Sequence, residues 1–271
     1  MNEGGLQPNT TRVLTSMGVA AFGSGALITV FTTPQIISLS QKSSSPLPKG
    51  SGSIFKRAGI KIFQTAILTQ TINKLLHFGS VRILKDALDD AGAFGAYNIN
   101  VAYGLVSIPM QAWSYNSLNA DVFRHFGKSQ PQTGTVTALA ADFFNKKIRP
   151  GFVWTFLRDS HSIGGGLLLG PIVAGHIVKA RSGALDQPSR GDRLAGGLVA
   201  GIFCGFGTQM PHNAALVAGR AAELGERLTT TDCFRRMWSE IGGKCFYQGF
   251  PHRVMVIAGI SGLLNLCEPF K

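Results

Sequence analysis

Long stretches without a charged residue alternate along the chain with shorter, basic segments. A helix needs about 20 mainly apolar residues to cross the hydrocarbon core of a membrane, and most of these stretches reach or approach that length. Because charge-free runs this long are rare in soluble folds, we prefer six membrane-spanning helices to the alternative of a soluble all-α protein. The stretches are residues 13–41, 63–81 (with one charge, Lys74), 91–120, 160–178, 194–219 and 254–267. The last is the shortest and spans a membrane if Arg253 and Glu268 extend toward the two surfaces.

The basic residues are concentrated on one side of this predicted topology. Segments 42–62, 121–157 and 220–253 have net charges of +5, +3 and +2, whereas the remaining loops and termini together reach only +1. Basic loops stay on the side of synthesis or face anionic lipid headgroups. We therefore expect these three loops on one face and both termini on the other. Since the basic residues follow loop sides and form no aromatic-interleaved patch, nucleic acid is not expected as a partner.

Prolines recur at equivalent places in the odd-numbered spans. Pro34, Pro109 and Pro211 each lie late in their span, just before a basic loop. A proline inside a helix removes one backbone hydrogen bond and clashes with the preceding turn, so each is expected to kink its helix. The even-numbered spans are preceded by related segments, GIKIFQT (59–65) and GKCFYQG (243–249). Three kinks at one depth predict a pseudo-threefold arrangement.

Short amphipathic segments in the second and third basic loops complete the repeat. Residues 137–148 and 230–243 place apolar side chains on one side and charges on the other, as surface helices do, and Thr229 is a candidate N-cap of the second segment. The first loop is shorter and is expected to lack this helix. The predicted organisation is a tail (1–11) and three repeats (12–90, 91–181 and 182–271).

Three helix pairs around basic loops, with a proline in each odd helix, resemble the mitochondrial carrier family. SEIGGKCFYQGFPHR (239–253) is similar to the family's signature before the last helix, and GFVWTFLRDSHS (151–162) is similar to its fourth helix. The resemblance implies an all-α membrane protein, a barrel of six transmembrane helices in three pseudo-threefold repeats. It also implies the mitochondrial inner membrane, with the basic loops in the matrix and both termini toward the intermembrane space.

The charged gate of that family is absent from this chain. In carriers each kink proline begins a motif whose acid and base pair across the barrel and close the matrix side. Uncharged residues occupy all six of these positions: Ile36, Leu39, Gln111, Ser114, Asn213 and Leu216. At the opposite gate only FGSVR is similar, with Phe78 and Arg82 matching and Gly79 in place of the acid.

The resemblance also implies substrate contacts midway along the even helices. Counting from the segments before these helices assigns the contacts to Ile72, Arg158 and Val256, with Asp159 beside the arginine. A charged residue within a membrane usually marks a water-filled cavity or an ion pair. Arg158 can therefore bind an anion, or Asp159 can simply neutralise it.

Two glycine-containing sites have different expected roles. Backbone amides at the starts of the fourth and sixth helices resemble cardiolipin sites, and the candidates are Gly151, Tyr247, Gln248 and Gly249. The glycines at 197, 201 and 205 lack the strand and the lysine of a phosphate loop, so we expect them to allow close helix packing.

The remaining polar residues indicate neither catalysis nor metal binding. His161, His176 and His212 are not spaced as metal ligands, and His212 is expected to be incidental to function. The four cysteines show no metal spacing and are expected to be reduced thiols. We therefore expect no enzyme and no cofactor other than bound cardiolipin.

Loss of the gate charges favours a degenerate carrier without transport activity. Such a protein would be a structural or accessory subunit of an inner-membrane assembly, such as a respiratory-chain or ATP-synthase complex. Its partners would be membrane lipids, including cardiolipin, and other subunits. The alternative is an active, divergent solute carrier that uses Gln111, Asn213 and Gln41 as a polar gate and Arg158 to bind a small anionic metabolite.

Overall fold

The computed structural model describes the chain except for residues 1–9, 43–50, 92–95, 127–135, 184–186 and 268–271. Every regular element within the described residues is a helix. The α-helices are α1 (Thr10–Lys42), α2 (Ser51–Ala91), α3 (Ala96–His125), α4 (Val136–Phe143), α5 (Phe152–Ser182), α6 (Arg190–Gly207), α7 (Gln209–Glu223), α8 (Thr230–Ile241) and α9 (Phe250–Cys267). A short π-helix, η1 (Phe144–Ile148), follows α4, and a 3₁₀-helix, η2 (Gly242–Phe246), follows α8.

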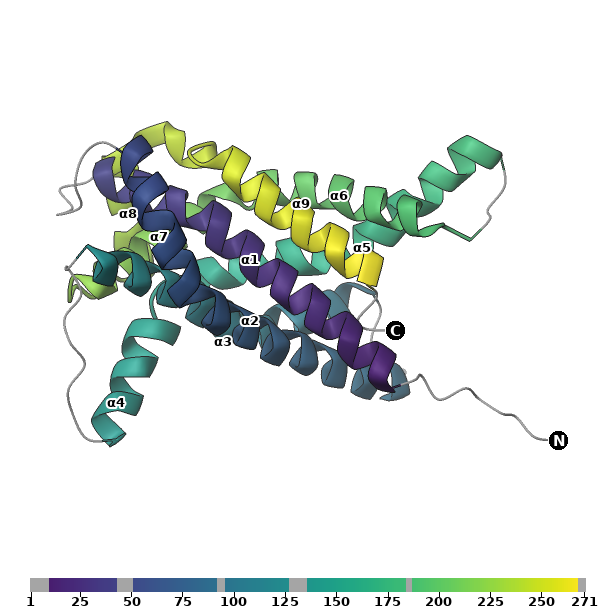
Figure 1. Ribbon diagram of the computed structural model, residues 1–271, viewed down its shortest axis with the longest axis horizontal. Coiled ribbons are helices and arrows are strands. Elements are labelled where there is room, and N and C mark those ends of the chain that lie inside the picture. Colours follow the sequence, from purple (N-terminus) through teal and green to yellow (C-terminus); the bar gives the residue numbers. More distant parts are fainter. Residues whose placement is uncertain (1–9, 43–50, 92–95, 127–135, 184–186, 268–271) are drawn as a thin grey trace.

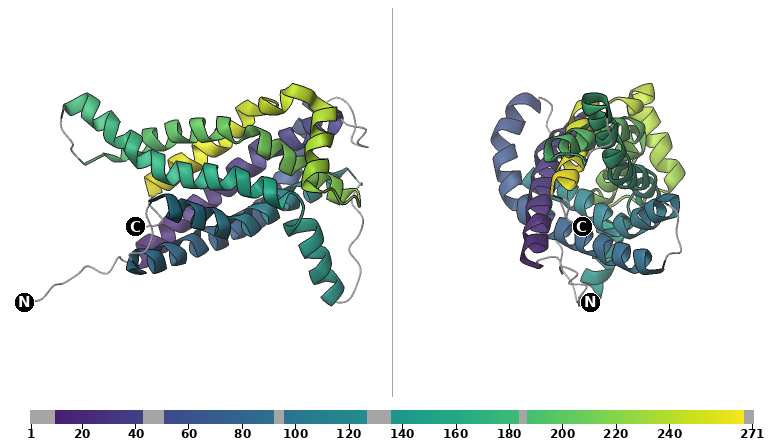
Figure 2. Two further views of the ribbon diagram at one scale, coloured as in Figure 1. Left: turned by 180° about the vertical axis from the view of Figure 1, so that it is seen from behind. Right: turned by 90° about the vertical axis from the view of Figure 1, so that its right-hand side faces the viewer.

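The long helices form a closed ring. Each packs against the next one in the chain: α1 on α2, α2 on α3, α3 on α5, α5 on α6, and α6 on α9. The last helix, α9, returns to pack on α1. The end-on view in Figure 2 shows these helices around a common centre. The short helices α4 and α8 are not part of this ring.

The two ends of the ring differ. The start of α1 and the end of α9 lie at one end, and α7, α8 and the start of α9 lie at the other (Figure 1). Thus the chain termini of the ring lie opposite the segments with the surface helices, as the charge pattern predicts. The predicted surface helices correspond to α4 with η1 and to α8, and Thr229 caps α8 by accepting a hydrogen bond from the Asp232 amide.

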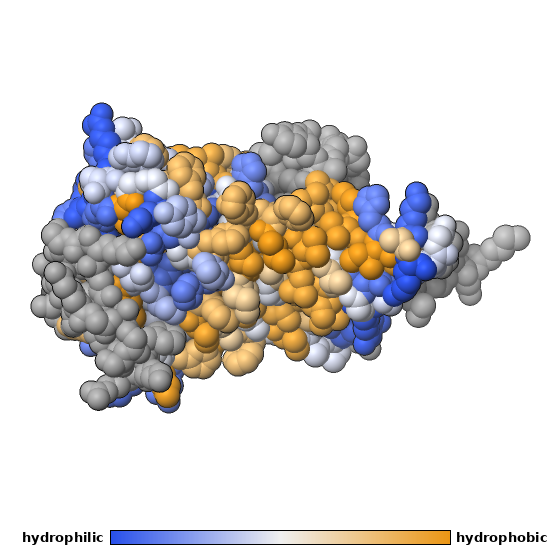
Figure 3. Space-filling model, turned by 90° about the horizontal axis from the view of Figure 1, so that it is seen from above, coloured by the Kyte–Doolittle hydropathy of each residue, from blue (hydrophilic) through white to orange (hydrophobic). Residues whose placement is uncertain are grey.

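Within the described residues, two helices are long and apolar enough to cross a membrane: residues Thr11–Ser40 of α1, and all of α9. The bent pair of α6 and α7 satisfies the same requirements as one broken span. On the face seen in Figure 3, a band of apolar side chains separates polar ends. Length and composition therefore support two or three membrane-spanning segments within the described residues.

The prolines act unequally. Helices α1 and α3 continue through Pro34 and Pro109, whereas α6 and α7 are bent by 64° at Thr208, three residues before Pro211. Proline disturbs the carbonyl four residues before it, which here belongs to Gly207, the last residue of α6. The kink predicted at Pro211 is therefore present as this bend, whereas α1 and α3 are each one continuous helix through Pro34 and Pro109.

The glycines of α6 bring it close to α9. A Cβ at Gly197 would lie 2.5 Å from the Ser261 carbonyl oxygen, and one at Gly201 would lie 2.4 Å from Ala258 Cα. A Cβ at Gly205 would make an ordinary van der Waals contact, 3.4 Å from Val254 Cα. The predicted packing role of this glycine row is confirmed.

Candidate functional site

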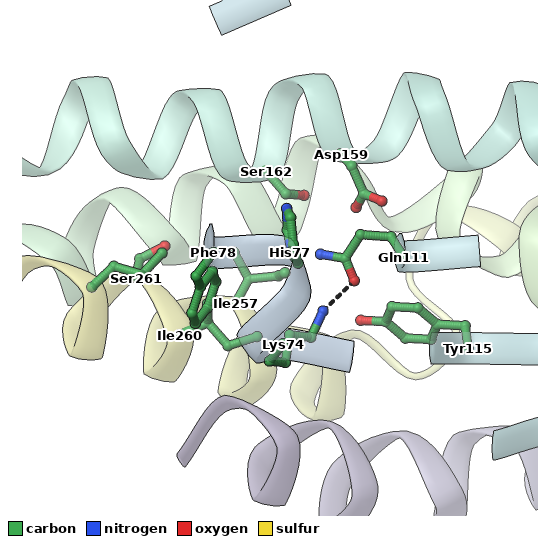
Figure 4. A pocket seen from close by; sticks show the side chains of 11 residues that line it. Lys74, His77, Phe78, Gln111, Tyr115, Asp159, Ser162, Ile257, Ile260 and Ser261 are labelled. Carbon is green, nitrogen blue, oxygen red and sulfur yellow. Dashed lines mark hydrogen bonds between the residues drawn. The ribbon is translucent and has the colours of Figure 1, made fainter. Parts of the chain in front are cut away.

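Polar side chains from four helices surround a narrow cavity inside the ring (Figure 4). The space open to the centre of a water-sized molecule is about 20 Å³, enough for about one water. The lining residues are Lys74, His77, Phe78, Gln111, Tyr115, Asp159, Ser162, Ile257, Ile260, Ser261 and Leu264. They belong to α2, α3, α5 and α9, so the site exists only when the ring is assembled.

Helix α5 contributes an ion pair between adjacent residues. Arg158 Nε and Nη2 donate to the two carboxylate oxygens of Asp159 at 2.7 and 2.6 Å. Both residues are buried. The guanidinium carbon also lies 4.2 Å from the centre of the Tyr115 ring, a cation–π geometry. The charge of Arg158 is thus matched by a carboxylate and an aromatic face.

Helix α9 contributes a second buried arginine whose partners are all neutral. The sequence suggested that Arg253, at the end of an apolar stretch, extends to a membrane surface. Its side chain is instead buried inside the ring, with 1% of its surface exposed. Its Nη1 donates to the Tyr115 hydroxyl at 3.2 Å, and its Nη2 contacts the Ser162 and Thr208 hydroxyls at 3.0 and 3.3 Å. Its Nε has no hydrogen-bond partner.

Helix α2 contributes a lysine and a histidine on one face. Lys74 Nζ donates to the Gln111 side-chain oxygen at 2.5 Å, and Lys74 is 1% exposed. His77, three residues later, is equally buried, and neither of its ring nitrogens has a hydrogen-bond partner. Buried polar groups are normally hydrogen-bonded. The imidazole of His77 therefore remains available to bind a ligand at the cavity wall.

A second layer of hydrogen bonds ties α1 to α7. His212 Nε2 donates to Gln35 Oε1 at 3.1 Å, because an amide oxygen can only accept. This leaves His212 Nδ1 to accept from Arg158 Nη1 at 3.5 Å. Gln35 Nε2 in turn donates to Asn213 Oδ1 at 3.1 Å. His212 is therefore part of the buried hydrogen-bond network, a structural role that the sequence did not indicate.

The charges of this cluster do not balance. Three cations, Lys74, Arg158 and Arg253, are almost fully buried. Asp159 is the only acidic side chain lining the cavity among the described residues. Unpaired buried charge is unfavourable unless a partner neutralises it. The arrangement can therefore hold an anion. No group of three or more metal-ligating side chains occurs within the described residues.

The six gate positions lie in the packed interior. All six are buried: Ile36, Leu39, Gln111, Ser114, Asn213 and Leu216. Ser114 donates a hydrogen bond to Gln70, and Asn213 donates to the main-chain oxygens of Cys245 and Gln248. Ser114 and Asn213 thus form uncharged hydrogen bonds, whereas Gln111 accepts from the Lys74 ammonium.

Charged contacts lie farther along α7. Arg220 donates to both carboxylate oxygens of Glu240 at 2.5 and 2.6 Å and to the main-chain oxygen of Leu39 at 3.2 Å. Lys147 donates to Glu223 at 2.7 Å. These pairs connect α7 with α8, α1 and η1 at the end of the ring that carries the surface helices.

The sequence-derived contact residues are only partly brought together. Arg158 and Asp159 belong to the buried cluster as expected, and Phe78 lines the cavity. Ile72 is 44% exposed and does not line this cavity. Val256 is buried in the apolar core but does not line the cavity. The one charge in an otherwise uncharged stretch, Lys74, is the sequence signal that points to α2.

The lipid-site candidates have contrasting environments. Gly151 and Gly249 directly precede α5 and α9 and have positive φ angles of 66° and 79°. Tyr247 is 59% exposed. The main-chain oxygen of Gln248 accepts from Gln209 and Asn213. Gly249 lies against Gln35, where a Cβ would be 2.6 Å from Nε2, so this turn packs on α1.

A second cavity lies between the start of α5 and the connection of α7 to α8. It is lined in part by Arg149, Arg227, Glu226 and Thr229. Glu226 also forms an ion pair with Arg236 of α8. Arg149 and Arg227 therefore lie near the exposed start of α5, where the backbone amides also favour negative charge.

Comparison with protein-family models and with curated proteins finds no match to this chain.

Proposed function

We propose that this protein is a carrier-type membrane protein that binds a small anion at the centre of its helical ring. The observation that carries the proposal is the excess of buried cations around the cavity. Lys74 and Arg253 have only neutral hydrogen-bond partners. Since a charge inside a membrane protein is stable when paired, a bound anion would supply the missing negative charge.

The ring gives this site a way to connect two sides of a membrane. Gln111 holds Lys74, while Gln35 holds Asn213 from another helix. The Gln35–Asn213 hydrogen bond is uncharged, and Lys74 donates to a neutral amide, so an anion would bind the Lys74 ammonium more strongly than Gln111 does. An anion that takes Lys74 from Gln111 would loosen the contact between α2 and α3. Binding could thereby favour one conformation over another, as transport by alternating access requires.

The proposed membrane, its orientation and its lipid contacts follow from the distribution of basic residues. Six units of the ring, with α6 and α7 as one broken span, would cross the mitochondrial inner membrane. The basic end would face the matrix and both termini the intermembrane space. The cavity with Arg149 and Arg227 and the turns at Gly151 and Gly249 would contact cardiolipin phosphates.

A second candidate is a non-transporting accessory subunit of an inner-membrane complex. The specific observation in its favour is the packed interior at the gate: Ile36, Leu39 and Leu216 are buried and apolar. Uncharged side chains at these positions cannot form the ion pairs that a carrier exchanges between two states.

Reconstitution of the pure protein into liposomes separates the two candidates. Saturable, protein-dependent uptake of a radiolabelled anion, reduced by Lys74→Met but not by Lys61→Met, supports the carrier. Lys61 is an exposed residue of the same helix and provides a matched control. Absence of anion uptake, together with migration in a large complex on native gels, supports the accessory subunit.

A further inference from the structure

The cavity has two chemically different walls. In the view of Figure 4, Gln111, Tyr115 and Asp159 lie on one side of Lys74 and His77, and Phe78, Ile257 and Ile260 lie on the other. Leu264 also lines the cavity. A small anion that bears only oxygen atoms would leave the apolar wall unused. An anion with a hydrocarbon part would bury that part against α2 and α9.

The charged side chains that line the cavity favour a ligand with one negative charge. Arg158 is already bound at both carboxylate oxygens by Asp159. Among the cavity-lining residues that the structure describes, Lys74 is the one cation, and it faces a neutral amide. Asp159 lines the same cavity and would repel a second carboxylate on the ligand. A dicarboxylate is therefore disfavoured relative to a monocarboxylate.

His77 supplies a second, independent indication of a ligand. Its side chain is 1% exposed, it lines the cavity, and both ring nitrogens lack a partner. Lys74 and His77 are three residues apart and so share one face of α2. Even a neutral imidazole has one N–H donor. A carboxylate has two oxygens, one for the Lys74 ammonium and one for this N–H.

We propose, building on the proposed anion site, that the cavity binds a short-chain monocarboxylate. One carboxylate oxygen accepts from Lys74 Nζ, which exchanges Gln111 for the ligand, and the other accepts from His77. The hydrocarbon part lies against Phe78, Ile257 and Ile260. The present space, about 20 Å³, must widen for any such ligand, which favours acids in the range from acetate to butyrate over longer fatty acids.

Thermal unfolding of the detergent-purified protein tests this proposal. Sodium acetate, propionate, butyrate, octanoate, malate and phosphate are compared with sodium chloride at one ionic strength. A ligand that binds only the folded state raises the unfolding temperature in a concentration-dependent way. We expect stabilisation by acetate, propionate and butyrate, and none by malate, phosphate or octanoate.

Three substitutions locate the ligand. Lys74→Met should weaken butyrate binding at least tenfold, and Lys61→Met should leave it unchanged. His77→Phe should weaken binding several-fold, while His77→Gln, which keeps an N–H donor, should retain more of it. Ile260→Ser should weaken butyrate binding more than acetate binding, because only the longer chain reaches the apolar wall. Unfolding without ligand shows whether each variant is folded.

The outcomes distinguish two levels of failure. Stabilisation by malate or phosphate but not by monocarboxylates overturns the monocarboxylate inference and leaves the central anion site standing. Stabilisation by monocarboxylates that Lys74→Met and His77→Phe do not weaken also overturns it, because the ligand then binds elsewhere. If no anion stabilises the protein beyond chloride, the anion site itself falls.

Discussion

The contact of α6 with α9 makes Gly201→Ala a sharp test of the fold. A Cβ at this position would lie 2.4 Å from Ala258 Cα, 2.7 Å from Ala258 N and 2.8 Å from Ile257 O. All three atoms belong to the backbone of α9, so no side-chain rotation relieves the overlap. The two helices must separate, and the ring would open at this seam.

The size of the effect follows from two opposing contributions. Overpacking an already close contact costs about 1–3 kcal/mol. Because the backbone of α9 must move to accommodate the new methyl group, the cost of Gly201→Ala lies near the upper value. Alanine gains about 1 kcal/mol over glycine inside a helix. The net loss is then about 2 kcal/mol. For a chain of this size, roughly 2–4 °C is lost per kcal/mol, so the unfolding temperature should fall by about 4–8 °C.

A thiol-reactive fluorescent dye can follow this unfolding directly. Cys204, Cys233 and Cys245 are buried in the folded chain and become reactive when it unfolds. Gly175→Ala is the matched control, because a Cβ there meets no heavy atom of another part of the chain within 4 Å. The control should unfold at the wild-type temperature or slightly above it. Equal unfolding temperatures for the two variants would refute the close contact.

Other contacts give smaller, separate tests. Arg220→Met leaves the Glu240 carboxylate without its bidentate partner and should destabilise the protein by about 3 kcal/mol, measured by the same dye; Glu240→Gln should cost less, since a neutral amide remains. Burial raises the pKa of the Cys233 thiol to about 11, so this thiol stays protonated and unreactive in the folded protein at neutral pH. Mass spectrometry after brief maleimide treatment at pH 7 should show no label on Cys233, and ready labelling of the folded protein would contradict this. Thr229→Ala removes the cap of α8 and should cost about 1 kcal/mol. The hydrogen bond from Thr229 lowers the pKa of Asp232, so its stabilisation is present above the ordinary carboxyl pKa and lost as pH falls through the folded value, and Thr229→Ala should reduce this loss in unfolding measured against pH.

The helical class and the arrangement of the two ends could be predicted from the sequence. Hydropathy and loop charge depend only on which residues occur in a segment, so an error of a few residues in aligning the repeats changes neither. The glycine row on α6 was also predictable, because residues four apart lie on one helix face. The bend before Pro211 is consistent with the backbone hydrogen bond that proline removes, although the same chemistry leaves α1 and α3 continuous at Pro34 and Pro109.

The facing of individual side chains required the structure. Ile72 and Lys74 are two residues apart, which is about 200° around a helix, so a two-residue error in alignment exchanges the outer surface for the cavity. Counting from the segment before α2 selects Ile72, whereas the residue of this pair that lines the cavity is Lys74. Arg253 was interpreted as a residue at the membrane surface because it ends an uncharged stretch. Its neutral partners come from α3, α5 and the residue between α6 and α7, which no local pattern brings together.

The central charges and the gate positions lead to different conclusions about function. Uncharged gate residues argue against a carrier, because ion pairs that exchange between two states are missing. The buried cluster argues in the other direction. A protein that serves only as a scaffold would gain stability by replacing Lys74 with an apolar residue, since a buried cation without an acidic partner is unfavourable. Lys74→Met should therefore raise the unfolding temperature in the absence of anions while weakening the response to them. A variant less stable than the wild type under anion-free conditions would instead mean that Gln111 and the surrounding dipoles satisfy Lys74 by themselves, and the case for a ligand would then rest on the unpaired nitrogens of His77.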